Sequence, residues 1–252
     1  FLKKAFNMDL GLSASLYDGD HFGSVKWCSL LGDMDHRWYT NNGLKKDISV
    51  FVKGEYTFLS HWTAYFDLQY RGISLDMTGV DDEFSDLNYS TKWSFFNPRF
   101  GLTFTPAVGH KAYLSAAVGH REPGRSDIKE VIESNNAGGE RAELSPEKML
   151  DFELGYEYTS SRFAAGVNFY AMEYWDMLLE TGRLSSVGYA LKENVGRAWR
   201  RGIELSGRWT IIPSWSVYAN MTLSTNKIKS FTAYVSKYDN MIDWNPTGQL
   251  EE

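Results

Sequence analysis

Apolar and polar residues alternate with a period of two along most of the chain. Between residues 62 and 70, the even positions are apolar or amphipathic and the odd positions are mostly polar. Between 150 and 158, leucine, phenylalanine and tyrosine alternate with Asp151, Glu153 and Glu157. A period of two places alternate side chains on opposite faces of a β-strand. A strand with three carboxylates on one face does not suit a dry core, so the pattern predicts a sheet with an oily face and a wet face.

The alternation and the turn signals together predict about nine strands. The expected strands cover residues 5–17, 47–58, 62–75, 94–105, 111–121, 148–159, 162–179, 191–210 and 215–228. Short connections (59–61, 106–110, 160–161 and 211–214) alternate with long polar ones (18–46, 76–93, 122–147, 180–190 and from 229 onward). Outer-membrane barrels have this arrangement, with short turns on one side of the membrane and long loops on the other.

Aromatic residues gather near the expected short turns. They are Phe58, Trp62, Phe104, Tyr158, Phe163, Trp209 and Trp215. Such a distribution is typical of the aromatic girdle at a membrane interface, although aromatic residues also favour strands in general.

Composition excludes several other classes of protein. No run of 18 apolar residues is present, so the sequence predicts no transmembrane helix. The net charge is -6 and no long Lys/Arg run occurs, which argues against nucleic-acid binding. A single cysteine, Cys28, cannot form an internal disulfide. The mean hydropathy of -0.39 would normally indicate a water-soluble chain. In barrel strands, however, the apolar and polar residues alternate, so their hydropathies average out.

Four segments between residues 97 and 205 carry short motifs in a recognisable order. They are Asn97-Pro98-Arg99 with Gly101; Tyr113-x-Ser115-x-Ala117 with Arg121-x-Pro123; Leu144-x-Pro146-Glu147-Lys148 with Glu153-x-Gly155; and Asn194-x-Gly196-x-Ala198 with Gly202-x-Glu204. In order and spacing they resemble the barrel of TonB-dependent outer-membrane receptors. The resemblance is clearest over residues 94–228, whereas the first 90 residues agree only in their strand pattern.

The resemblance implies an all-β, antiparallel up-and-down transmembrane barrel. In that family the barrel has 22 strands and encloses a plug domain preceded by a TonB box. Only about nine strands are expected here and neither plug nor TonB box is visible, so we expect residues 1–252 to form part of the barrel domain.

The same resemblance implies a receptor in the outer membrane of a Gram-negative bacterium. It would bind a scarce nutrient (a ferric siderophore, haem, cobalamin or a glycan) and import it with energy supplied through TonB. Its partners would be outer-membrane lipid, the nutrient and the TonB complex, the last through the missing plug and TonB box. No cofactor, nucleic acid or enzymatic step is implied.

Aromatic and cationic residues in the expected long loops are the candidates for ligand binding. They are Trp38, Tyr39, Arg121, Arg125, Arg141 and Tyr189. Exposed aromatics capture ligands, and arginines attract anionic chelates. Packing of the loops on themselves is the alternative explanation for these residues.

Other chemistry is weakly signalled. No catalytic constellation is present, and the five histidines lack zinc-site spacing. The acidic run 81–83 invites comparison with a calcium loop, but its spacing is irregular and a solvated surface is the favoured interpretation. We expect Gly101, Gly155 and Gly202 to permit bends or close approach of plug segments, or simply to be tolerated in a wide lumen.

Two other functions remain open from the sequence alone. A small closed barrel would be a passive pore or a structural outer-membrane protein, and nine or ten strands are just enough to close one. A soluble carbohydrate-binding β-sandwich would line one face with aromatics and would not need a continuous oily outer band.

Overall fold

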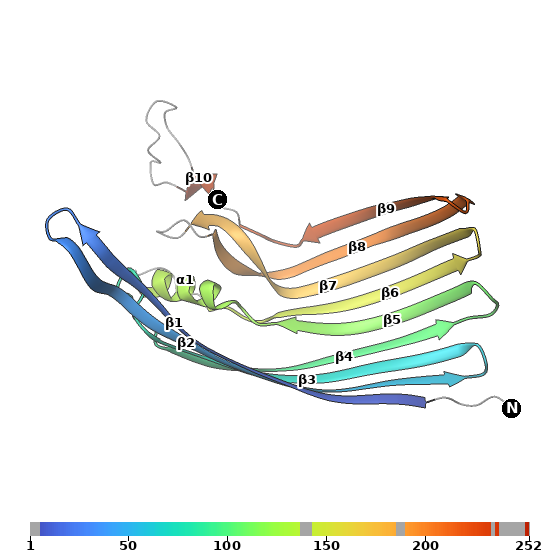
Figure 1. Ribbon diagram of the computed structural model, residues 1–252, viewed down its shortest axis with the longest axis horizontal. Coiled ribbons are helices and arrows are strands. Elements are labelled where there is room, and N and C mark those ends of the chain that lie inside the picture. The colour runs from blue at the N-terminus through green and yellow to red at the C-terminus, as the bar shows by residue number, and fades with distance from the viewer. Residues whose placement is uncertain (1–5, 137–142, 185–189, 233–234, 237–249, 252) are drawn as a thin grey trace, which may run out of the picture.

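A single antiparallel sheet dominates the computed structural model of the protein, which describes residues 6–136, 143–184, 190–232, 235–236 and 250–251 (Figure 1). The elements are β1 (Phe6–Cys28), β2 (Gly32–Phe58), β3 (Trp62–Gly79), β4 (Tyr89–Phe104), β5 (His110–Arg121), α1 (Arg125–Asn136), β6 (Glu147–Thr159), β7 (Phe163–Leu184), β8 (Ala190–Ile212), β9 (Trp215–Ile228), β10 (Val235–Ser236) and β11 (Leu250–Glu251).

Each of the first nine strands pairs with its neighbours in the chain. The sheet order is β1-β2-β3-β4-β5-β6-β7-β8-β9, and every pairing is antiparallel. The sheet curves into an open trough with α1 inside it (Figure 1). The nine expected strands are therefore confirmed, and the β-sandwich alternative is wrong because these strands form one sheet rather than two.

The two faces of the sheet have the chemistry that the alternation predicts. The apolar side chains Phe152 and Leu154 are 47% and 54% exposed on the outer face of the trough, whereas Asp151 is 8% exposed on the inner face. Antiparallel pairing extends each face across strands, so one register row on the outer face reads Leu102, Leu114, Leu154, Phe169, Ile203 and Leu223. An exposed apolar surface of this extent is favourable in contact with lipid and unfavourable in contact with water.

The predicted aromatic girdle lies on the outer face beside the short turns. Phe58, Trp62 and Phe104 occupy one register row, and the rings of Trp62 and Phe104 stack with centroids 4.3 Å apart. Phe163 and Trp209 are opposite each other in the register, two short turns further along the sheet. Aromatic rings at this level are the usual boundary between hydrocarbon and headgroups.

The strands extend beyond the expected ends on the side of the long connections. Residues 18–46 were expected to be a loop. They instead form the second half of β1 and the first half of β2, joined by a tight turn at 29–31. Similarly, β7 continues to Leu184. These extensions carry polar residues on both faces, because both faces meet water beyond the membrane, and the alternation that marks a strand in the sequence is lost there.

Outside the large sheet, β10 and β11 pair with each other, and α1 lies within the connection from β5 to β6. Among the described residues, no helix is both long enough and apolar enough to cross a membrane.

Candidate functional site

Helix α1 covers the inner face of the sheet at the end with the long connections. Its apolar residues Ile128, Val131 and Ile132 recur at helical spacing and lie on one side. Ile128 packs on Leu75 and Met77 of β3, which are 4% and 1% exposed. The carboxylate of Asp127 accepts a hydrogen bond of 3.1 Å from the backbone N–H of Gly124, half of a capping box. This helix was not expected from the sequence, although the spacing of its apolar residues was a usable signal.

Two polar contacts connect α1 to strands on opposite walls of the trough. Arg125, at its first position, donates a hydrogen bond to Asn41 Oδ1 on β2. Lys192 Nζ on β8 lies 3.0 Å from Asp127 Oδ1. Because β2 and β8 are far apart in the sheet order, the helix bridges the concave side of the trough (Figure 1).

A cluster of carboxylates lies between α1 and the β3–β4 connection. Ligand atoms of Asp81, Asp82 and Glu133 lie within 4.8 Å of one another. Lys129 Nζ is 3.1 Å from Asp82 Oδ1 and 2.7 Å from Glu133 Oε1, so an ammonium group supplies positive charge there. Asp81 is fully buried, and the expectation that the acidic run is a solvated surface is therefore wrong for this residue. Burial and the neighbouring carboxyl group of Asp81 raise the pKa of Glu133 to about 7.

A second ionic network lies on the inner face next to the helix. Arg71 Nη2 lies 2.5 Å from Asp47 Oδ2, and Arg71 Nη1 lies 3.0 Å from Glu122 Oε2. Lys45 Nζ completes the network at 2.7 Å from Glu122 Oε1. Burial alone would raise the pKa of Glu122, but the hydrogen bond from Lys45 and the charge of Arg71 outweigh it and hold that pKa below its ordinary value. The network fixes the segment that leads from β5 into α1.

The ligand-binding residues expected from the sequence do not form one cluster. Trp38 on β2 donates to the carbonyl of Asp82 at 3.0 Å and packs on Phe84 with ring centroids 5.3 Å apart. Tyr39, also on β2, packs over Gly23 of β1. Trp38 therefore contacts the β3–β4 connection, whereas Tyr39 contacts β1.

The expected arginines have different surroundings. Arg125 lies against Gly43 beside its partner Asn41, so it fastens the helix to β2. Arg121, at the end of β5, pairs with Glu147 while its side chain stays 66% exposed. Among the described candidates Arg121 is thus the cation with most contact to the open trough. Arg141 and Tyr189 lie outside the described residues.

Asn194 has a structural role that its motif did not reveal. Its amide Nδ2 donates to the carbonyl oxygens of Ser145 and Asp176, at 2.9 and 2.6 Å, and its Oδ1 accepts from the backbone N–H of Ser145 at 2.8 Å. Asp176 has a positive φ of 53°. Asn194 therefore fastens the start of β6 to a strained point of β7, which sequence spacing alone does not predict.

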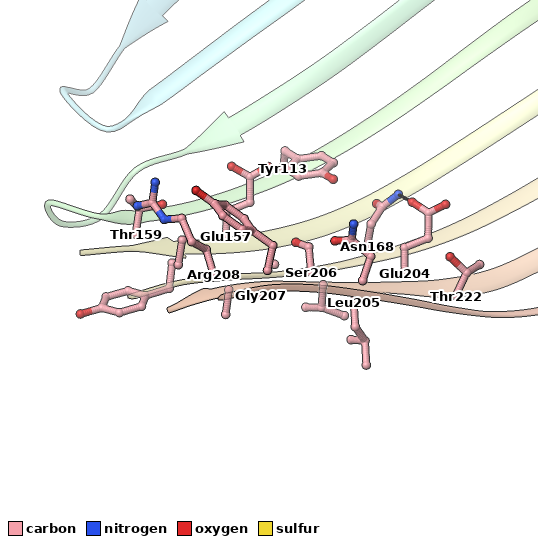
Figure 2. A pocket seen from close by; sticks show the side chains of 17 residues that line it. Tyr113, Glu157, Thr159, Asn168, Glu204, Leu205, Ser206, Gly207, Arg208 and Thr222 are labelled. Atoms are coloured by element: carbon pink, nitrogen blue, oxygen red, sulfur yellow. Dashed lines mark hydrogen bonds between the residues drawn. The ribbon is translucent and has the colours of Figure 1, made fainter. Parts of the chain in front are cut away.

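Nearer the short turns, the inner face of β6–β9 forms an open polar groove of about 610 Å³. Figure 2 shows Glu157, Glu204 and Arg208 on the inner side of the strands, while Leu205 points the opposite way. Asn168 Oδ1 and Arg208 Nε are buried in this region without a hydrogen-bond partner. The groove is polar enough to contact water or another polypeptide segment.

Three inner-face glycines lie opposite tyrosines in the sheet register. The pairs are Tyr65 with Gly101, Tyr113 with Gly155, and Tyr170 with Gly202. A Cβ atom built on Gly155 would lie 2.1 Å from Cζ of Tyr113, so the tyrosine ring occupies the space of the missing side chain. These rings explain why no side chain is present at the three glycines, and contact with a plug segment stays a prediction.

The curved sheet, its lipid-facing outer side and its polar inner side define part of a transmembrane β-barrel. Residues 4–243 match the family model described as "TonB dependent receptor-like, beta-barrel", and the chain belongs to this family. It is therefore a component of the outer membrane of a Gram-negative bacterium. No curated protein sequence matches the chain.

Solved structures share the fold at low sequence identity. The copper transporter OprC matches with a TM-score of 0.72 and 15% identity, over 89% of this chain and 35% of its own. The ferric-catecholate import receptor Fiu from E. coli K12 matches with a TM-score of 0.64 and 11% identity, over 91% and 36%. The FrpB iron transporter from Neisseria meningitidis matches with a TM-score of 0.56 and 19% identity, over 74% and 26%. The chain thus spans about a third of the length of these relatives.

Proposed function

We propose that this chain forms part of the wall of a receptor that binds a scarce nutrient and imports it with energy supplied through TonB. In this proposal residues 1–252 are one portion of a larger barrel domain, most closely related to the family over residues 94–228. The TonB complex acts through a plug and TonB box outside this chain.

The observation that carries the proposal is that the two ends of the inner face differ: one end is covered and the other is open. At the end with the long connections, α1 and two ionic networks build a fixed platform on it. Nearer the short turns, the inner face of β6–β9 is an open polar groove. Gated import requires one region that binds the ligand and another that contacts a movable plug. In this proposal the platform is the first region and the groove is the second.

The chemistry of the platform favours an anionic metal chelate as the nutrient. Among the candidates, it favours a ferric siderophore over haem, cobalamin or a glycan. Arg121 presents a guanidinium to the trough, and Trp38, which lies apart from Arg121 on β2, is 47% exposed. Guanidinium and aromatic groups together bind the carboxylate, catecholate and ring groups of such chelates. The structural relatives, an iron transporter, a copper transporter and a ferric-catecholate import receptor, agree with this choice.

The direct test is growth and uptake in a strain that lacks the gene. We expect loss of growth on one iron source, restored by the wild-type gene and abolished again when TonB is removed. Uptake that continues without TonB would contradict energy coupling and would favour a passive pore. Growth that is unchanged on every iron source, and lost on a glycan, would move the proposal to a carbohydrate ligand.

The role of the platform is tested by Arg121→Ala, with Arg162→Ala in a short turn as the matched control. Loss of a charge-assisted contact to an anionic chelate is expected to weaken binding by about tenfold. The control variant should bind as the wild type does, because its arginine lies at the opposite end of the sheet. Equal binding by both variants would remove Arg121 from the ligand site.

A further inference from the structure

Two tryptophans on the outer face are each flanked by two cations. Trp175 on β7 has Lys148 Nζ 5.5 Å and Arg197 Cζ 5.3 Å from its ring centroid. Trp199 on β8 has Arg201 Cζ at 4.6 Å and Lys227 Nζ at 5.8 Å. We call these six residues, together with Glu173, the Trp–cation patch. Its members come from four consecutive strands, β6 to β9.

The register of the sheet organises the patch into two rows. Lys148, Trp175 and Arg197 are directly opposite one another on adjacent strands. Glu173, Trp199 and Lys227 form the neighbouring row. All of these positions share the parity of Leu154, Phe169 and Ile203, so they belong to the lipid-facing side of the sheet.

The patch begins where the apolar band ends. On β6 the outer positions from Tyr158 to Leu150 are aromatic or aliphatic, and the next outer residue is Lys148. At about 3.3 Å per residue and a strand tilt of about 40°, the span from Tyr158 to Lys148 rises about 25 Å, the height of the band on outer-membrane barrels. The patch therefore lies at headgroup level, on the side of the long connections.

The charge of the patch is strongly unbalanced. Four cations share one carboxylate, Glu173, which pairs with Arg201 at 2.5 Å, so the patch carries a formal charge of +3. The chain as a whole has a net charge of -6. Within the described residues, Lys148, Arg197 and Lys227 have tryptophan rings as their partners, and a ring leaves the N–H donors of a cation free to bind an anion.

The other end of the sheet lacks this arrangement. On the outer face of β1 and β3, toward the long connections, lie Asp18, Asp20 and Asp76, with Lys46 and Lys92 on β2 and β4. Within the described residues, the outer face of β6–β9 thus carries an excess of cations that the outer face of β1–β4 lacks.

We propose that the Trp–cation patch is a binding site for the phosphate-bearing headgroup of a lipid in the outer leaflet. Its position continues the lipid-facing surface, and its charge complements phosphate groups. The tryptophan indoles lie at the interface, and the ammonium and guanidinium groups bind the phosphate oxygens. The site requires only that the barrel lies in the outer membrane, and it is independent of which nutrient is imported.

The test compares variants with matched loss of charge in the detergent-solubilised receptor. Lys148→Gln/Lys227→Gln removes two cations from the patch, and Lys46→Gln/Lys92→Gln removes two from the opposite sector. The probe is a glucosamine-based lipid with phosphate groups, and native mass spectrometry measures how much stays bound. Each cation near an anionic headgroup contributes roughly fivefold, so the patch variant, which lacks two cations, should bind about 25-fold more weakly. The control should bind as the wild type does.

Two further arms separate the lipid from other sources of the same chemistry. The lipid with its phosphates removed should bind weakly to every variant, and inorganic phosphate should neither bind nor compete. Equal binding of both lipids by the wild type, or equal loss in patch and control variants, would overturn the proposal. Competition by inorganic phosphate would also overturn it, in favour of a site for soluble anions.

A charge-conserving variant covers the case in which the patch variant does not fold. Lys148→Arg/Lys227→Arg keeps the charge and should keep the binding, whereas Arg197→Gln alone should lose about fivefold. Strand content by circular dichroism confirms that each variant is folded. Unchanged binding in folded Arg197→Gln would contradict the role given to the patch.

Discussion

The outer and inner faces of the sheet are built from neighbouring residues, but different forces hold them. The outer row through Leu154 contains only aliphatic and aromatic side chains, any of which contacts lipid equally well. The adjacent inner row reads Thr103, Tyr113, Gly155, Asn168, Glu204 and Thr222. Here a ring covers a glycine, and Asn168 donates to Glu204 at 3.4 Å. The outer face depends on the class of side chain, whereas the inner face depends on particular pairs.

The largest expected effect is a charge placed on the outer face. Leu154→Arg should lower the free energy of unfolding by about 2–4 kcal/mol, because the guanidinium would lie in hydrocarbon. The neighbouring Glu153→Arg places the same charge on the inner face and should cost much less. Denaturant unfolding of the receptor in lipid measures both. Equal losses would mean that the two faces are assigned wrongly.

On the inner face, the largest effect should come from breaking the network around Glu122. Its side chain is 10% exposed, and Glu122→Ala leaves Arg71 and Lys45 without that carboxylate. We expect a loss of about 2 kcal/mol, less than for a fully buried ion pair because Lys45 is partly solvated. Glu157→Ala is the control: it breaks a half-exposed contact to Lys111 of 3.4 Å and should cost less than about 1 kcal/mol. Similar losses would show that burial does not distinguish the two pairs.

The glycine–tyrosine pairs should produce a smaller but specific effect. Gly155→Ala forces the ring of Tyr113 away and should cost about 1–2 kcal/mol. Gly119→Ala, also on the inner face, meets only Met149 Cε at 3.7 Å and should be tolerated. In the background of Tyr113→Ala the cost of Gly155→Ala should disappear. A cost that persists in the double variant would trace to the backbone instead of the ring.

The smallest expected effect is a pH dependence at α1. The raised pKa of Glu133, about 7, means that the folded protein binds a proton that an unfolded carboxylate has released. Stability from this group is therefore present at low pH and is lost as the pH rises from about 5 through 7. Asp81, Asp82, Lys129 and Glu130 surround the group.

Hydrogen exchange of the α1 amides, corrected for intrinsic rates, measures this effect. In the wild type, protection of the helix should decrease over that pH range, and Glu133→Gln should make protection independent of pH. A wild-type helix whose protection rises with pH would reverse the sign and contradict the assignment to Glu133.

The sequence predicts the features that repeat and misses those that depend on unique contacts. Alternation predicts all nine strands within the membrane, because lipid and water impose opposite demands on successive residues. It fails for residues 18–46, where water meets both faces. The network of Asp47, Arg71 and Glu122 depends on strand register and on the path into α1, which spacing in the chain does not determine.

The candidate site shows the same limit. Arg125 attracts attention in the sequence as a free cation, yet in the structure it is held at Asn41, and Trp38 is held at the carbonyl of Asp82. Asp81 is fully buried, although its acidic neighbours in the sequence suggest an exposed surface. Burial in this region comes from a helix that crosses the trough, and helix placement is a tertiary property.

The bridge formed by α1 has a mechanical consequence. A barrel wall that flattens moves β2 and β8 apart, and one of the contacts to Asn41 or Lys192 must then stretch or break. A force that shifts the helix must, in turn, alter the cross-section of the wall. The cross-sectional shape of the barrel and the position of α1 therefore change together.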